Sequence, residues 1–234
     1  MKTMFLFGLL SLSLIAGHST SPDLSHLEGI SDNRFLSKIA EEETNGKTCE
    51  HLCERAQVQD FEPAKVSGAG QQILVSSLVQ KALKDQSQLL AIRKSDLERW
   101  NDADRIHFAR WFGTTNEAAR ELISKRIHIL IQLNEEYSVG NFRKAVPSRK
   151  GVFAFVRASD PSRIFVDTEF INASHLGENS RAGTICHEMS HFKLAGGTRD
   201  IVYGMNRCKR LARLSPAHAL SNADNFEFYM EGAQ

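Results

Sequence analysis

Apolar residues recur at steps of three and four along residues 71–100, the pattern of the buried face of an amphipathic helix. The first of them are Ile73, Leu74, Leu78, Val79 and Leu83. The same period returns after residues 101–104, whose Asn and Asp side chains are typical helix N-caps, and again over residues 117–137. The pattern predicts a largely helical region from residue 71 to residue 137.

The period shortens in the next segment. Residues 151–157 and 163–167 are rich in Val, Ile and Phe, and a turn-forming run at 158–162 separates them. We expect these two segments to be strands of a small sheet. Residues 205–214 are expected to form a helix again, and the Ser-Pro pair after it can begin another. The predicted fold class is therefore α+β, mostly helical with a small β-sheet.

An H-E-x-x-H motif lies between these strands and the last helices, formed by His187, Glu188 and His191. Positions four apart share one face of a helix, so the two imidazoles can converge on one metal ion. Glu188 projects from a neighbouring part of the surface and could take a proton from a water molecule on that metal. The alternative is a surface helix with two histidines and a glutamate by chance. The motif predicts two zinc ligands and a base, with a third ligand from elsewhere.

Three arrangements for the third ligand can be compared with the sequence. An H-E-x-x-H-x-x-G-x-x-H motif would need His at the position of Gly197, so it is excluded. Glu227 and Glu231 are the glutamates left downstream, and both are far along the chain. Asp200 follows a pair of glycines, which can end a helix and let the chain fold back toward it. Three protein ligands would leave a fourth position for water, as in catalytic zinc sites.

Residues 197–204, GTRDIVYG, resemble the G-T-x-D-x-x-Y-G signature of the aspzincin metallopeptidases, the family of deuterolysin and peptidyl-lysine metalloendopeptidase. Together with the H-E-x-x-H motif at this spacing, the resemblance is specific. It implies a zincin-like fold whose active-site helix contains that motif. It implies that His187, His191 and Asp200 bind one zinc ion and that Glu188 is the general base. It also implies that the phenol of Tyr203 hydrogen-bonds the oxyanion of the tetrahedral intermediate.

Residues 221–229, SNADNFEFY, resemble the N-A-D-N-x-E-Y-F segment of the lysine-specific branch of this family. The resemblance implies that Asp224 and Glu227 form the acidic floor of the pocket for the residue after the scissile bond. Two carboxylates three positions apart share a helical face. In a partly desolvated pocket they would favour an ammonium group. The alternative is a solvated acidic surface near the C-terminus.

Composition and charge describe an ordinary globular protein. The chain has 234 residues, of which 41% are hydrophobic and 24% are charged, and its formal net charge is +1. This balance gives no reason to expect nucleic acid or an anionic membrane as a partner. We expect a monomer that acts on protein or peptide substrates.

The N-terminus predicts secretion. A Lys near the start, an apolar run over residues 4–15 and small residues after it are typical of a signal peptide, which we assign to residues 1–19. That run is shorter than the about 20 apolar residues of a membrane span. Residues 20–65 are polar and run into the linker-like segment 63–70, PAKVSGAG, so we expect a propeptide and linker there. The catalytic domain is expected at residues 66–234.

Four cysteines in a secreted chain can form two disulfides; they are Cys49, Cys53, Cys186 and Cys208. A bridge from Cys186 to Cys208 would tie the motif helix to the next helix. For Cys49 and Cys53 we favour a role in bracing the pro-segment. The alternative is that one of them blocks the zinc as a thiolate until the propeptide is cleaved.

The sequence therefore predicts a secreted zinc metalloendopeptidase, made as a zymogen, with one zinc ion and a preference for Lys on the C-terminal side of the scissile bond. One strand of the small sheet is expected to pair with extended substrate, although the sequence does not show which. A deuterolysin-like enzyme of broader specificity is the second hypothesis. A secreted zinc-binding protein without catalytic activity is a third, from a different class.

Overall fold

The computed structural model describes residues 69–232, with side chains from residue 75 onward. The predicted signal peptide at 1–19, the propeptide at 20–65, and Cys49 and Cys53 lie outside these residues. No helix among the described residues is long and apolar enough to cross a membrane.

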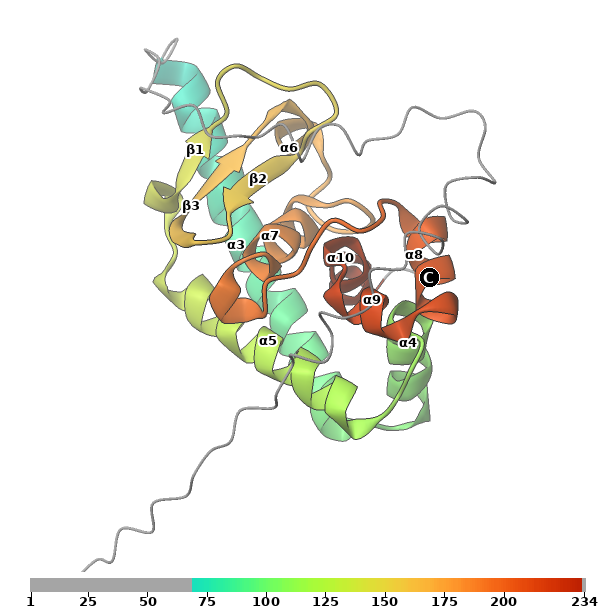
Figure 1. Cartoon of the computed structure of the whole chain (residues 1–234). Helices are drawn as coiled ribbons and strands as arrows, with labels where there is room; N and C mark the ends of the chain where they lie inside the picture. Colours follow the sequence, from blue (N-terminus) through green and yellow to red (C-terminus); the bar gives the residue numbers. More distant parts are fainter. Residues whose placement is uncertain (1–68, 233–234) are drawn as a thin grey trace, which may run out of the picture. The chain divides into compact units, whose positions relative to one another are not determined.

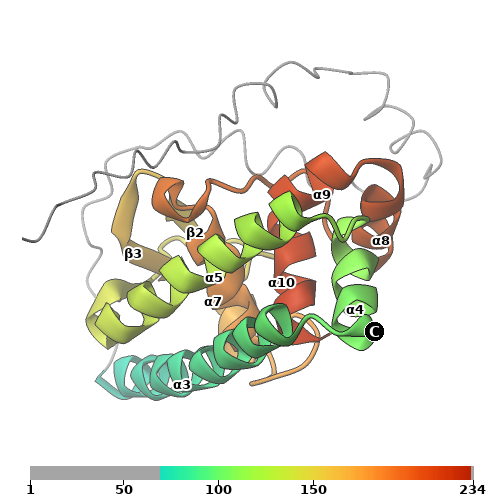
Figure 2. The same ribbon diagram turned by 90° about the horizontal axis from the view of Figure 1, so that it is seen from below.

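Three helices form the first half of the described chain, as the apolar period predicts. They are α3 (Ala69–Arg99), α4 (Asp102–Phe112) and α5 (Glu117–Glu136). Asn101 begins α4 with a capping box, in which its side chain and that of Asp104 each accept from the other residue's backbone N–H. Figure 2 shows α3 and α5 side by side.

A three-stranded sheet follows, with β1 (Phe142–Lys144), β2 (Ala154–Arg157) and β3 (Asp160–Val166) in the order β1-β3-β2. β2 is antiparallel to β3 and β1 is parallel to it. The two predicted strands are confirmed as β2 and β3, but β3 begins at Asp160, inside the run predicted as a turn, because Arg157 already pairs with Asp160. β1 was not predicted because three residues give no measurable period. β2 is the edge strand that contacts the helix α7 (Arg181–Ser190) (Figure 1).

The remaining described elements are short helices and turns, several of which pack on α7. They are the short helix α6 (Thr168–Asn172), the 3-10 turns η2 (Val139–Asn141) and η3 (Lys193–Ala195), and the helices α8 (Met205–Leu214), α9 (Pro216–Ser221) and α10 (Ala223–Glu231). Every residue of α7 is buried, because α3, α5, α10 and β2 all pack against it. The sheet lies on one side of α7 and α10 on the other (Figure 1).

Aromatic side chains fill the core between α4 and α10. The fully buried ones there are Phe108, Trp111, Phe112, Phe228 and Tyr229. The rings of Trp111 and Phe228 stack with their centroids 5.2 Å apart. The motif helix α7 packs on α10 and also on α3. At the contact with α3, Gln86 Nε2 donates to Met189 Sδ at 3.2 Å. The motif helix therefore lies in the middle of the hydrophobic core, which holds it rigidly.

Candidate active site

The motif helix α7 begins at a cap that its own sequence supplies. Ser180 is the N-cap, and its side-chain oxygen accepts from Gly183 N at 3.0 Å. The helix ends at Ser190, and His191 follows as its C-cap with helical backbone angles. His187 and His191 therefore lie one turn apart, with their ring centroids 4.9 Å apart and their planes at 79°.

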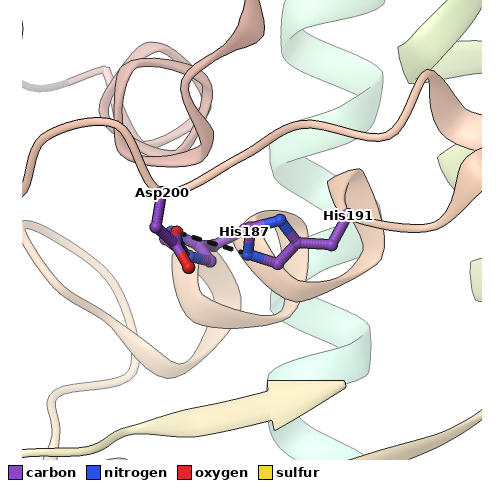
Figure 3. A group of neighbouring side chains, drawn as sticks. All are labelled: His187, His191 and Asp200. Atoms are coloured by element: carbon purple, nitrogen blue, oxygen red, sulfur yellow. Dashed lines mark hydrogen bonds and ion pairs between the residues drawn. The ribbon is translucent and has the colours of Figure 1, made fainter. Parts of the chain in front are cut away.

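The chain after α7 turns back as the paired glycines predict. Gly196 and Gly197 have φ of 100° and 58°, a region that glycine adopts without strain. Thr198 N then donates to Ser190 O at 3.0 Å, which returns the chain to the end of α7. Asp200 follows, and Figure 3 shows its carboxylate directed toward the two histidines.

The carboxylate of Asp200 meets the same nitrogen of both rings. Its Oδ1 lies 3.1 Å from Nε2 of His187 and 3.4 Å from Nε2 of His191. Glu227 lies instead at the opposite nitrogen of His187, at 2.9 Å from Nδ1. Glu231 lies at the start of α7, where it accepts from Ser180 N. The fold thus brings Asp200, rather than either glutamate, to the two Nε2 atoms.

The hydrogen bonds at Nδ1 determine what the Nε2 atoms can do. Nδ1 of His191 lies 2.8 Å from the carbonyl oxygen of Thr198, which can only accept, so this nitrogen holds the proton. Nδ1 of His187 faces Glu227 and, at 3.1 Å, Asp224 Oδ1. In the neutral form of each ring, Nε2 then has a lone pair directed at the Asp200 side. Two imidazole nitrogens and a carboxylate oxygen, all within 4.8 Å of one another, fit the donor set of a zinc ion.

Burial dominates the electrostatics of Glu188, which is only 5% exposed. Burial raises the pKa of its carboxyl group to about 7, although the nearby His187 and His191 oppose this shift. A carboxylate whose pKa lies close to neutral pH can both accept and return a proton. The site therefore contains a group with the acid–base properties of a general base.

Tyr203 lies on the same loop as Asp200, three residues later, and is 36% exposed. The next residue, Gly204, donates its N–H to Asp224 Oδ2 at 2.7 Å. The phenol thus lies at the surface, on a loop whose far end is attached to α10.

Asp224 and Glu227 are not a solvated acidic surface, and that alternative is wrong. They are 7% and 6% exposed, and both face His187. Burial raises the pKa of Glu227, and its hydrogen bond to His187 opposes the shift. Their contact with His187 was not predicted. The Nδ1 of a metal-binding histidine needs a hydrogen-bond acceptor. That requirement could have indicated from the sequence that a downstream carboxylate contacts His187.

A cleft of about 280 Å³ opens beside His191 and Asp200. Its lining residues are Val156, Ala158, His191, Thr198, Arg199 and Asp200. Val156 belongs to β2 and Ala158 directly follows it, so the edge strand borders the candidate metal ligands His191 and Asp200. Thr198 is a residue that the sequence prediction missed, because its contribution is a backbone carbonyl.

The possible bridge between Cys186 and Cys208 is not formed. Both are buried free thiols. Cys186 lies on α7, where Gln86 of α3 is its hydrogen-bond partner, whereas Cys208 lies on α8 with Asn222 Nδ2 at 3.5 Å. Burial raises the pKa of both thiols above the usual range. The two sulfurs therefore have different neighbours in the core.

Comparison with known proteins shows the family to which the chain belongs. Residues 99–231 match the aspzincin family model, described as lysine-specific metallo-endopeptidase. The chain is 31% identical over 154 residues to a peptidyl-Lys metalloendopeptidase of Pleurotus ostreatus, covering 64% of this chain and 88% of that protein. It is 28% identical over 209 residues to an extracellular protease of Aeromonas hydrophila, covering 88% of this chain. That alignment spans about half, 54%, of the Aeromonas protein.

A solved structure shares the fold. The zinc peptidase from Grifola frondosa superimposes with a TM-score of 0.59 at 26% sequence identity, covering 70% of this chain and 96% of the other. The predicted α+β, zincin-like fold class is thereby confirmed. The family model covers more than half of the chain, including the motif helix, the Asp200 loop and α10. The chain belongs to the aspzincin family of metallo-endopeptidases.

Proposed function

We propose that the protein is a secreted zinc metalloendopeptidase that cleaves peptide bonds before Lys. The observation that supports the activity best is the convergence of His187 Nε2, His191 Nε2 and Asp200 Oδ1 beside the buried Glu188. The family match and the protease relatives agree with it.

The three converging side chains would hold one zinc ion. Zinc, when bound, supplies a Lewis acid that lowers the pKa of a water molecule to about 7. Glu188 accepts the proton of the attacking water and passes it to the leaving amine. Tyr203 donates a hydrogen bond to the oxyanion that develops on the substrate carbonyl. Thr198 and Glu227 keep the two imidazole rings oriented.

The edge strand β2 offers a place for the substrate backbone. It borders the cleft that contains His191 and Asp200, and its outer edge faces away from β3. An extended peptide can add to such an edge through main-chain hydrogen bonds. We assign β2, rather than β1, as the strand that positions the scissile bond.

The preference for Lys is supported by the two carboxylates of α10. Asp224 and Glu227 are buried next to the site, on the turn that also receives the N–H of Gly204 after Tyr203. An ammonium group there would be attracted strongly, because few water molecules screen the charges. The family description and the name of the Pleurotus relative agree with a lysyl preference.

Secretion and activation are supported by the N-terminal sequence and by the Aeromonas relative, which is named an extracellular protease. N-terminal sequencing of the secreted protein is expected to show loss of residues 1–19 and then of a propeptide ending near residue 65. A mature N-terminus that retains residues 20–65 would contradict the zymogen.

The test of the function uses the processed, zinc-loaded protein on casein and on a whole-proteome digest. We expect cleavage that a zinc chelator abolishes and added zinc restores. Asp200→Ala should lose zinc and activity together, whereas Asp102→Ala, a carboxylate that is 89% exposed on α4, should keep both. Cut sites before Lys support the proposal, and broad cut sites favour a deuterolysin-like enzyme. No cleavage by the zinc-loaded protein would favour a non-catalytic zinc-binding protein.

A further inference from the structure

Asn222 is completely buried where α9 meets α10, and its side chain binds the backbone of the Asp200 loop. Its Oδ1 accepts from Ile201 N at 2.8 Å and from Val202 N at 3.1 Å. Its Nδ2 donates to Val202 O at 3.1 Å. One carboxamide therefore satisfies three backbone groups directly after Asp200.

Backbone hydrogen bonds hold the same loop directly before Asp200. Arg199 N donates to Ser221 O at 2.8 Å, and Ala223 N donates to Arg199 O at 3.0 Å. The two partners of Arg199, Ser221 and Ala223, flank Asn222 in the sequence. Asp200 is thus held on both sides, by main-chain bonds at Arg199 and by the Asn222 side chain at the next two residues.

The loop depends on these bonds because it contains little regular structure. Among the described residues, the segment between η3 and α8 forms one β-bridge, from Arg199 to Asn222. Val202 is 7% exposed, so its N–H and carbonyl need partners inside the protein. Without Asn222 these groups would be buried without hydrogen bonds, which favours displacement of the loop toward water.

The carboxamide itself is held in one orientation. Its Nδ2 also donates to Asn225 Oδ1 at 2.8 Å, and Asn225 Nδ2 donates in turn to Trp111 O at 2.6 Å and Cys208 O at 2.9 Å. Asn225 therefore anchors Asn222 to α4 and α8. The pocket requires an acceptor facing the N–H groups of Ile201 and Val202 and a donor facing Val202 O. Only an amide of this length offers both.

We propose that Asn222 is a positioning residue that sets the place of the Asp200 carboxylate relative to His187 and His191, and of Tyr203 after it. This inference rests on the proposed zinc site. The Asp200 loop and α7 are separate segments, and α10 contacts both. Asn222 and Asp224, at the start of α10, bind this loop at Val202 and Gly204, and Glu227 binds His187. Asn222 thereby determines whether Asp200 already lies at the two histidine nitrogens before a metal ion binds.

The experiment measures the zinc dissociation constant of the processed protein by competition with a chromogenic chelator. Asn222→Ala is expected to weaken zinc binding about 10–100-fold, the usual effect of removing a residue that orients a metal ligand. Asn222→Asp keeps an acceptor for Ile201 and Val202 but places a second oxygen against Val202 O, so an intermediate loss is expected. Amide hydrogen exchange at Ile201 and Val202 should accelerate in both variants.

The matched control is Asn134→Ala. The Asn134 amide donates to Leu83 O at 2.9 Å and Gln86 Oε1 at 2.8 Å, which joins α5 to α3 away from the loop. This variant should keep the wild-type zinc affinity even if it melts at a lower temperature. If Asn222→Ala folds poorly, Asn222→Asp provides the same comparison. Wild-type zinc affinity in a folded Asn222 variant would overturn the inference, whereas a wild-type protein that binds no zinc would overturn the proposed function.

Discussion

Glu227 Oε2 lies 2.9 Å from Nδ1 of His187, and both groups are buried. His187 meets Asp200 through its other nitrogen, so the imidazole lies between two carboxylates that come from different parts of the chain. A carboxylate at Nδ1 fixes the orientation and tautomer of a metal-binding histidine. Glu227, assigned from the sequence to substrate recognition, is therefore placed to orient His187 as well.

Replacements at Glu227 separate these two roles. Glu227→Gln retains an acceptor oxygen for His187 Nδ1, so zinc affinity should stay close to wild type while the preference for Lys falls. Glu227→Ala removes the acceptor, so zinc affinity should also fall, by about 10–100-fold. Chelator competition and cleavage-site profiling measure the two properties. An unchanged Lys preference in Glu227→Gln would show that this carboxylate does not bind the substrate ammonium.

Glu188→Gln tests the general base. The amide has nearly the same shape but cannot accept the proton, so kcat should fall by about 10²–10⁴-fold or more. Zinc content should stay at the wild-type level, because Glu188 is outside the proposed ligand set. Turnover of a peptide substrate and metal analysis of the same preparation provide the two values. Full activity in this variant would mean that another group takes the proton.

Tyr203→Phe tests the oxyanion donor. Loss of one such hydrogen bond typically lowers kcat by about 10²–10³-fold, and KM should change little because the bond forms in the transition state. Tyr137→Phe is the control, since the Tyr137 hydroxyl donates to Pro161 O in β3. Steady-state kinetics of both variants decide the point. Equal kcat in Tyr203→Phe and wild type would exclude the phenol from the reaction.

Glu231 predicts a pH dependence of stability. Burial raises the pKa of this carboxyl group from 4.5 to about 8, with Glu227 adding to the shift, and hydrogen bonds from Ser180 oppose it. Between pH 4.5 and about pH 8, Glu231 is protonated in the folded state and ionised in the unfolded state. The free energy of unfolding should therefore fall as pH rises through this window, by at most about 1.4 kcal/mol per pH unit for this group.

Glu231→Gln removes that titration and keeps an acceptor for Ser180. Its stability relative to wild type should rise between pH 5 and pH 8, as measured by denaturant unfolding at several pH values. Since His187 and Glu188 titrate in both proteins, the difference between the two curves reports the titration of Glu231 together with its interaction with Glu227. A constant difference across the window would mean that Glu231 is ionised throughout in the folded protein.

Much of the fold follows from local sequence patterns. The three- and four-residue period of α3 and α5 and the β-rich segments of β2 and β3 each depend on residues close together in the chain. The spacing of His187 and His191 and the glycine pair before Asp200 are local features too. The sequence therefore predicted the long helices, two strands and the likeness to aspzincins without knowledge of packing, whereas the short helix α6 was not predicted.

Contacts between distant segments were decided only by the tertiary structure. The acceptor of His187 lies 40 residues away on α10, and Asn222 reaches back 20 residues to Val202. The free thiols of Cys186 and Cys208 and the position of β2 at the cleft likewise result from how α7, α10 and the sheet pack together. The sequence by itself determined which residues could hold a metal and move a proton, because those are properties of side chains at local spacings. The fold decided which groups orient those side chains, because that depends on buried contacts between segments that share no local pattern.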